Sequence, residues 1–319
     1  MSNNQQYRTV AIRLAETALG VVVSSVLFAA YMAIPLAGFF SGLLAPFPAT
    51  FFRLRHGSTT GVIIILGTTA LLTAGFGFQA GLLYLLQCGV IAFMSTELLV
   101  HGYGGARAIA WTVAANVATL AVAALAYSML TGENIHTLAI NEINTSIAQT
   151  IKIYESAGIK GDDLVLVKQS MTWVGALIGR VYPALVTIML IIATGFNLFF
   201  CKRSASRMGI ELKVGSFYDF RNPELLIWLL IAAGFALLSD NPIINVPGLN
   251  LLAVTTTLYF LQGLAAMLTI IARQSFVGLL RVMLFVMLLF QPYLIALVAA
   301  FGIFDLWGDF RTPAKIENL

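Results

Sequence analysis

Long apolar stretches separated by short polar ones fill the chain from Ala15 to Phe304. Several run for about 20 residues, the length at which a helix crosses a ~30 Å hydrocarbon core. They lack the polar face that a helix of a soluble protein keeps. The pattern predicts an all-α, polytopic transmembrane helical bundle with about 8–9 spans, folded as a single integral membrane domain over residues 1–319. The predicted segments are Ala15–Leu36, Ala37–Phe52, Thr59–Ala74, Phe78–Val100, Ala106–Leu130, Met171–Phe200, Pro223–Leu238, Leu249–Ala272 and Val282–Phe304.

The distribution of lysines and arginines predicts the orientation. If the N-terminus is cytoplasmic and every segment crosses, twelve fall inside, five fall outside and Arg180 lies within a span. Such a bias is the positive-inside pattern, and it predicts a multi-pass protein of the bacterial inner membrane with a cytoplasmic N-terminus. The inside residues are Arg8, Arg13, Arg53, Arg55, Arg107, Lys202, Arg203, Arg207, Lys213, Arg221, Arg273 and Arg281, and the outside ones are Lys152, Lys160, Lys168, Arg311 and Lys315.

The stretch PFPATFFRLRHGSTTG, residues 46–61, interrupts the apolar pattern with two prolines and a basic cluster. Its prolines end a short helix, and its arginines anchor the turn in the cytoplasm. Two paths for Ala37–Phe52 stay open: it crosses the membrane, or it dips in and returns. The charge bias favours crossing, because a re-entrant segment would move every later loop to the other side.

Two polar loops are long. In the extracytoplasmic loop of residues 131–170, apolar residues recur at helical spacing over Ile140–Tyr154, which predicts an amphipathic surface helix. Such a helix either lies on the membrane surface or covers a binding cavity. The cytoplasmic loop of residues 201–222 is basic at its start and aromatic at its end, a composition that suits docking to anionic headgroups or to a partner subunit.

Composition narrows the function. Hydrophobic residues make up 59% of the chain and charged residues 10%, and the mean hydropathy is +0.91. The net charge of +4 lies in short loops, so it indicates topology and a lipid bilayer partner, with no nucleic acid. The chain has no Walker, HExxH or GxSxG motif and only three histidines. We therefore expect no catalytic residues, no cofactor, no metal and no enzymatic activity.

Arg180 is the main candidate for ligand binding, because an arginine within a span is costly to bury without a partner. Pro183 follows it and opens the backbone of the helix. We predict that Arg180 lines an outward-facing polar pocket roofed by Ile140–Tyr154, with Tyr182 and Asn116 nearby. Its ligand would be a small anion. The alternative is that Arg180 reaches toward the membrane surface or pairs with a loop carboxylate.

Two glutamines are further ligand-binding candidates. Gln262 and Gln291 each adjoin aromatic residues, and Pro292 breaks a helix beside Gln291. These features predict a pocket of amide and aromatic groups, although interhelical hydrogen bonds would explain both side chains equally. Glu97 is expected either to snorkel toward the membrane surface or to pair with Arg107 or Arg55 on the cytoplasmic side.

Five segments resemble a known family. PFPATFFRLRHGSTTG, YPALVTIMLIIATGFNLFFCKR, FRNPELLIWLLI, LYFLQGLA and LFQPYLIALVAAFGIFDLWGDFR occur in this order. Together they resemble the bacterial YybS-like membrane family, a domain of unknown function. The first part is more remotely similar to the substrate-binding S-components of energy-coupling-factor transporters and to the rod-shape protein MreD. This chain has more spans and a longer outer loop than either.

The resemblance implies two functions of different classes. The first is a small-molecule binding or transport component similar to S-components, which would take its ATPase module from partner subunits. The second is a non-enzymatic assembly or scaffold protein of the cell envelope, similar to MreD, that acts through helix contacts. An enclosed polar cavity would favour the first, and a solid bundle with an exposed groove would favour the second.

Overall fold

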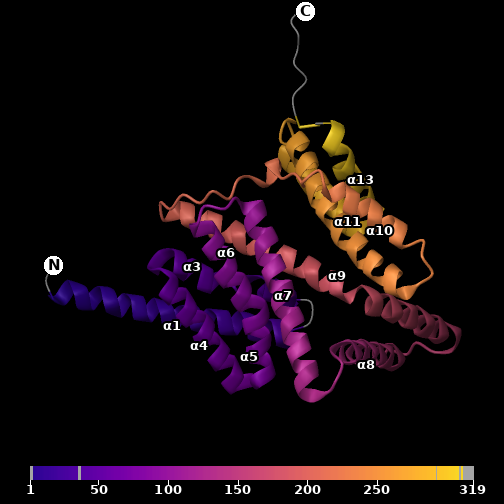
Figure 1. Ribbon diagram of the computed structural model, residues 1–319, viewed down its shortest axis with the longest axis horizontal. Helices are drawn as coiled ribbons and strands as arrows, with labels where there is room; N and C mark the ends of the chain where they lie inside the picture. The colour runs from indigo at the N-terminus through magenta and orange to yellow at the C-terminus, as the bar shows by residue number, and fades with distance from the viewer. Residues whose placement is uncertain (1–2, 35–36, 292, 309, 312–319) are drawn as a thin grey trace, which may run out of the picture. The chain divides into compact units, whose positions relative to one another are not determined.

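The computed structural model describes residues 3–34, 37–291, 293–308 and 310–311 (Figure 1). Of these residues, 85% are helical and none is in a strand. The chain forms two compact units, which are described separately below. Unit 1 comprises Met1–Leu130 and Met189–Gly215, and unit 2 comprises Thr131–Ile188 and Ser216–Leu319.

Unit 1 is a bundle of apolar helices that ends with the C-terminal part of α9, from residue 189 on. Gly57 and Gly77 both have φ of 92°, which allows sharp turns after α3 and α4. A π-helical turn, Leu85–Gly89, joins α5 to α6. The complete helices are α1 (Asn3–Ala33), α2 (Ala37–Leu44), α3 (Phe47–His56), α4 (Ser58–Phe76), α5 (Phe78–Tyr84), α6 (Val90–Val100) and α7 (Gly105–Thr131).

The predicted segment Ala37–Phe52 consists of two helices, because the turn at Ala45 and Pro46 separates α2 from α3. Together they run antiparallel to α1. The Ser24 hydroxyl of α1 donates a hydrogen bond to the Ala45 carbonyl at 3.1 Å, and Glu16, two turns earlier, binds Arg55 and His56 at the end of α3. The pair thus returns along α1 toward its N-terminal end. The structure holds no membrane, so whether this pair crosses one or re-enters stays a prediction.

Polar side chains join three helices inside unit 1. The Asn197 amide, on α9, donates to the Thr50 hydroxyl of α3 at 3.1 Å and to the Ser95 hydroxyl of α6 at 3.3 Å. All three side chains are fully buried. An amide between two hydroxyls is a typical contact between membrane helices. An apolar core of unit 1 is formed by Phe28, Ala45, Ala49, Phe52, Ile64, Ile65, Leu72, Tyr84, Cys88 and Ala92.

Unit 2 contains two antiparallel helix pairs. In the first, α8 lies along the N-terminal part of α9: Ile140 faces Gly179, Ile147 faces Gly175, and Lys168 pairs with Glu155 at 2.8 Å. In the second, α10 and α11 are joined by a short turn. The helices are α8 (Ile135–Ser156), α9 (Gly161–Arg207, of which residues 161–188 belong to this unit), α10 (Leu226–Ala236), α11 (Pro242–Ile271), α12 (Val277–Phe290) and α13 (Tyr293–Gly308).

Helices α11 and α13 cross in close contact at two glycines. A Cβ atom at Gly263 would collide with the Val298 carbonyl oxygen, and one at Gly302 would collide with the Tyr259 carbonyl oxygen. The two backbones therefore touch directly, the arrangement that small residues permit between membrane helices. This contact fixes where the end of α13 lies.

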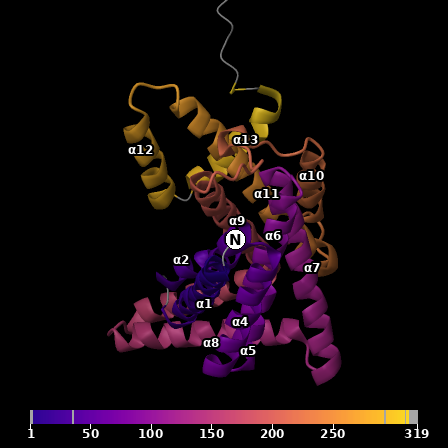
Figure 2. The same ribbon diagram turned by 90° about the vertical axis from the view of Figure 1, so that its left-hand side faces the viewer.

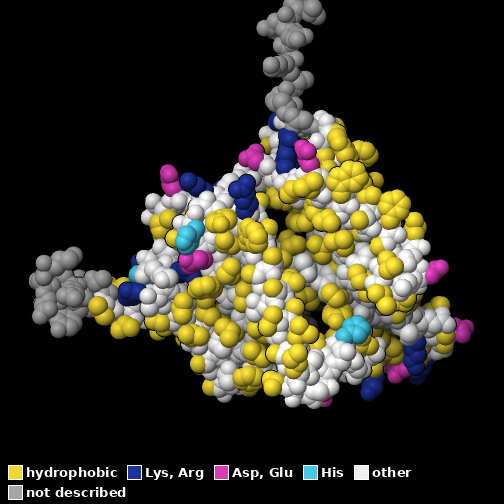
Figure 3. All heavy atoms as spheres, viewed as in Figure 1, with side chains coloured by type: hydrophobic (Ala, Val, Ile, Leu, Met, Phe, Trp, Pro, Cys, Tyr) yellow, Lys and Arg dark blue, Asp and Glu magenta, His cyan; other side chains and the backbone are white. Residues whose placement is uncertain are grey.

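Six described helices are long and apolar enough to cross a membrane. Hydrophobic side chains are spread over the face shown in Figure 3, where charged side chains are few. The predicted count of 8–9 is not confirmed. Three predicted spans fall short: the broken α2–α3 segment, the 11 residues of α10, and the last segment. That last segment is two helices, α12 and α13, bent by 120°. If they count as one span, the total is seven.

The bend corrects one part of the predicted topology. Arg311 was placed across the membrane from Arg273 and from the loop of residues 201–222. In unit 2, however, Arg273 donates a hydrogen bond to the Arg311 carbonyl, and the Arg311 guanidinium donates to the Tyr218 carbonyl at 2.9 Å. Arg311 therefore lies at the same end as Arg273, because α13 turns back where a straight last span would have continued. Lys315 lies outside the described residues.

Candidate functional site

Arg180 lies three residues before a proline in a continuous helix. Pro183 lies inside α9, and one helical turn there is completed by a side chain of α11. The Asn250 amide donates to the Arg180 carbonyl at 2.7 Å and accepts from the Ala184 amide at 2.8 Å. These two backbone groups are the ones that an unbroken helix would join to each other. Asn250 therefore holds the turn that carries Arg180 against the start of α11.

The Arg180 side chain binds a neutral group. Its guanidinium donates to the Asn245 side-chain oxygen at 2.6 Å. Asn245 in turn donates to the Leu237 carbonyl at 3.0 Å and the Ser239 carbonyl at 3.3 Å, so it is fixed by the end of α10. In the part of the chain that is described, no carboxylate pairs with Arg180, and its side chain is exposed. A guanidinium has five N–H donors, so several are free for a ligand.

Arg180 lies near the end of unit 2. Its partner Asn245 is in the first turn of α11, level with the turn that joins α10 to α11. The sequence predicted that Arg180 lies within the span Met171–Phe200. Helix α9 begins ten residues before that segment, at Gly161, and Arg180 is exposed at the level of the α10–α11 turn.

Tyr182 and α8 lie beside this region. The Tyr182 hydroxyl and His136 Nδ1, near the start of α8, form a hydrogen bond of 3.0 Å. Between α8 and α9 runs an open groove of about 330 Å³, and neither Arg180 nor Tyr182 lines it. Its lining is mostly apolar: Glu142, Ile143, Ser146, Ile147, Thr150, Met171, Val174 and Ile178. In unit 2, therefore, α8 packs along the helix that carries Arg180 without enclosing its guanidinium.

Asn116, the third predicted member of the pocket, belongs to unit 1. It is fully buried on α7, and its amide donates to the Gln87 carbonyl at 2.9 Å. Gln87 is part of the π-helical turn, where the irregular hydrogen-bond pattern leaves this carbonyl available. The observed contact of Asn116 is thus an interhelical one.

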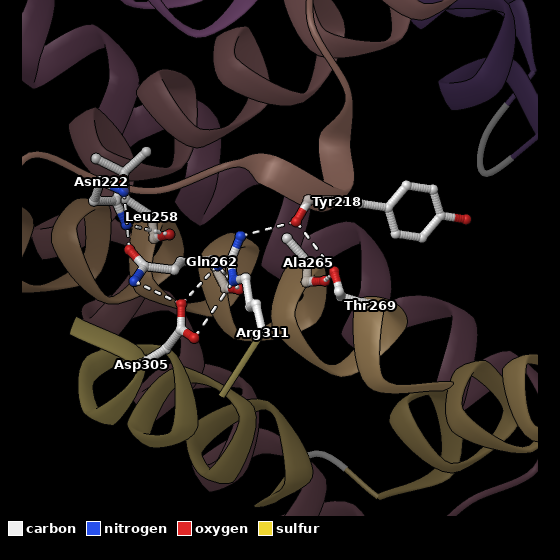
Figure 4. A network of polar contacts seen from close by, with 8 residues as sticks. All are labelled: Tyr218, Asn222, Leu258, Gln262, Ala265, Thr269, Asp305 and Arg311. Atoms are coloured by element: carbon white, nitrogen blue, oxygen red, sulfur yellow. Dashed lines mark hydrogen bonds and ion pairs between the residues drawn. The ribbon is translucent and has the colours of Figure 1, made fainter. Parts of the chain in front are cut away.

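Gln262 belongs to a buried network at the other end of α11. Its side-chain oxygen accepts from the backbone N–H of Asn222 at 2.9 Å, and its NH₂ group donates to Asp305 at 3.3 Å. Arg311 completes the network with an ion pair to Asp305 at 2.7 Å and a hydrogen bond to the Gln262 carbonyl at 3.3 Å. Figure 4 shows the Tyr218 carbonyl turned toward Arg311 and its ring turned away. Gln262 and Asp305 are fully buried, so a ligand cannot reach them in this conformation.

Gln291 is not near Gln262 in this network. It lies exposed at the end of α12, where its backbone amide donates to the Met287 carbonyl at 2.8 Å. The predicted helix break at Pro292 lies outside the described residues.

Sequence reasoning missed the Asp305–Arg311 pair, because Arg311 follows the last predicted span. It also chose the wrong partner for Glu97. That carboxylate pairs with Arg53 and, at 3.5 Å, with His101, where Arg55 or Arg107 was expected. Among the described residues no group of three His, Cys, Asp or Glu side chains forms a metal-ligand set.

Comparison with known proteins gives a family and nothing closer. The family model described as "Predicted membrane protein (DUF2232)" matches residues 22–306, which is most of the chain. No curated protein and no solved structure matches the chain.

Proposed function

We propose that this chain, which belongs to the family of predicted membrane proteins DUF2232, is a membrane-embedded component that binds a small anionic molecule for transport. In this proposal the protein is not an enzyme, and it lies in the bacterial inner membrane with its N-terminus in the cytoplasm. Arg180 faces the outside and binds a carboxylate or phosphate group of the ligand.

The observation that carries the proposal is that Arg180 is exposed and that its hydrogen-bond partner is a neutral side chain. Its guanidinium is exposed and positioned by Asn245 at 2.6 Å, while Asn250 holds the backbone of the same turn. A charged group held by neutral amides keeps its full charge for a ligand, and it loses less conformational entropy on binding than a mobile side chain. Since the described residues offer it no carboxylate, an anion would gain a charge-assisted hydrogen bond.

The finer features follow the resemblance stated above. If the chain is YybS-like and similar to S-components, an ATPase on separate subunits would supply the energy for transport. The basic segment of residues 201–222, whose first seven residues are the end of α9, suits the docking of such a subunit, because Arg203 and Arg207 are exposed there. The helix α8, with no buried residue, is then the amphipathic helix of the extracytoplasmic loop.

A scaffold role is the second candidate, and the shape of the grooves favours it. The groove beside α8 and a second groove in unit 1, of about 530 Å³ between α6 and α7, are both open and largely apolar. Open apolar grooves suit contacts with other membrane helices better than the capture of a small anion. In this case Arg180 would only mark the membrane boundary.

Purified protein in detergent separates the two functions. Native mass spectrometry would identify any retained anion, and thermal-shift titrations with monocarboxylates, dicarboxylates and inorganic phosphate would measure binding. We expect Arg180→Gln to weaken binding at least about tenfold, with a smaller loss for Arg180→Lys. Arg207→Gln, another exposed arginine, is the matched control.

Equal binding by the wild type and Arg180→Gln would overturn the proposal. Retention of a second membrane protein without any retained anion would favour the scaffold role.

A further inference from the structure

The junction of α11 and α12 carries two arginines without acidic partners among the described residues, Arg273 in the connecting turn and Arg281 in α12. Arg273 donates a hydrogen bond to the Arg311 carbonyl, and the Arg281 guanidinium lies 5.8 Å from the centre of the Tyr218 ring. Neither forms an ion pair within the described residues. The nearby Asp305 carboxylate is already paired with Arg311. This end of unit 2 therefore has positive charge that is not neutralised.

Arg281 has an unused donor as well. Its Nε atom is buried and has no hydrogen-bond partner. A buried N–H of a charged group without an acceptor is unfavourable, so an acceptor outside the described residues would stabilise it. The first turn of α12 also lacks a hydrogen-bond acceptor, because Phe276 at its N-cap supplies no side-chain hydrogen bond. Unpaired N–H groups at a helix start attract anions.

The rest of α12 is apolar and unpartnered. None of its residues is buried, and Figure 2 shows it standing apart from α11 and α13. Arg281 is its only charged residue, and it lies in the second turn. At 14 residues the helix is about 21 Å long. Its exposed side chains include Leu279, Val282, Met283, Val286, Leu289 and Phe290.

We propose that this junction binds an anionic phospholipid, with the phosphate on Arg273 and Arg281 and the acyl chains along α12. One amphipathic ligand explains both features, since its headgroup supplies the missing anion and its tails cover the apolar helix. Basic clusters on the cytoplasmic side of a membrane protein bind anionic headgroups in this way. A free phosphate would match the arginines but would leave α12 uncovered.

This site is separate from Arg180. Asn245, the partner of Arg180, and Ile271, at the end of α11, are roughly 40 Å apart along the helix at 1.5 Å per residue. The two sites therefore occupy opposite ends of unit 2, and the lipid site stands or falls independently of the proposed function.

The test is lipid titration of delipidated protein, followed by native mass spectrometry. The probes are dioleoyl-phosphatidylglycerol, dioleoyl-phosphatidylcholine, dihexanoyl-phosphatidylglycerol and inorganic phosphate. We expect the wild type to prefer the long-chain anionic lipid over the other three. Arg273→Gln/Arg281→Gln should weaken its binding about tenfold to thirtyfold. The control Lys152→Gln/Lys160→Gln removes the same charge from the α8–α9 hairpin and should change binding less than about twofold.

Each alternative result contradicts the proposal. Equal losses of lipid affinity in the two double variants would show that binding depends only on the protein's net charge and not on this site. Equal affinity for the long-chain and short-chain lipids would remove the role of α12, and phosphate binding without lipid preference would make this a site for free anions. Because Arg273 also contacts Arg311, the single variant Arg281→Gln is measured too. If it unfolds at the wild-type temperature and still binds the lipid fully, the site is wrong.

Discussion

Two arginines at opposite ends of α11 show how differently the same side chain can be used. Arg311 is buried, paired with Asp305 at 2.7 Å, and bonded to the carbonyls of Tyr218 and Gln262. Arg180 is exposed and bonded to one neutral amide. The first has nearly all of its donors occupied inside the protein, while the second has most of them free. Capacity to bind a ligand therefore depends on what the fold leaves unpaired, and not on residue type.

The largest effect should come from breaking the buried pair. Arg311→Ala leaves the Asp305 carboxylate buried without a counter-charge, which costs about 3–5 kcal/mol. We expect a clear drop in the thermal unfolding temperature in detergent, and a smaller loss in Asp305→Asn/Arg311→Gln than the two single losses combined. Arg207→Ala is the exposed control. Wild-type stability of Arg311→Ala would show that the pair is not structural.

A smaller loss of stability is expected from a substitution at the close contact between α11 and α13. In Gly302→Ala the new Cβ would lie 2.7 Å from the Gly263 nitrogen and closer still to the Tyr259 carbonyl. Forcing the helices apart should cost about 1–3 kcal/mol and loosen the Arg311 network. Gly278→Ala in α12, where nothing lies within 4 Å, should be neutral or slightly stabilising. If both variants unfold at the same temperature, the close backbone contact is absent.

The smallest loss of stability is expected from a substitution of Arg180. Arg180→Gln removes one exposed hydrogen bond, and the free energy of unfolding should change by no more than about 0.5 kcal/mol. The same melting measurement without added anion checks this. A loss comparable to that of Arg311→Ala would mean that both arginines are structural, and the contrast between them would disappear.

Apolar runs predicted most long helices well. The span Phe78–Val100 has the predicted bounds, and α4 and α7 differ from prediction by one or two residues. Hydropathy could not locate the breaks, because Pro46 interrupts a helix whereas Pro183 lies inside one. The difference is tertiary: Asn250, 66 residues after Ala184, supplies the bonds that keep α9 continuous.

The candidate sites were harder to predict, for a related reason. The sequence marks an arginine inside an apolar run, so it drew attention to Arg180. It does not mark which distant groups neutralise a charge, so Gln262 looked available although Asn222, 40 residues away, and Asp305, 43 residues away, occupy its amide. Arg311 looked like a loop residue because it follows the last predicted span, and the sequence does not show that its partner and its acceptors come from three separate segments.

The contact of Asn197 has a consequence for the order of biosynthesis. Asn197 is made 147 residues after Thr50 and 102 residues after Ser95, the two hydroxyls that it joins. At about 5–20 residues per second, the earlier helices wait about 5 to 30 seconds in the bilayer for the final helix of unit 1. During that interval the polar faces of α3 and α6 are open. A chain truncated after α7 would lack Asn197 and would leave the Thr50 and Ser95 hydroxyls without this partner, so we expect it to be a substrate for membrane quality control.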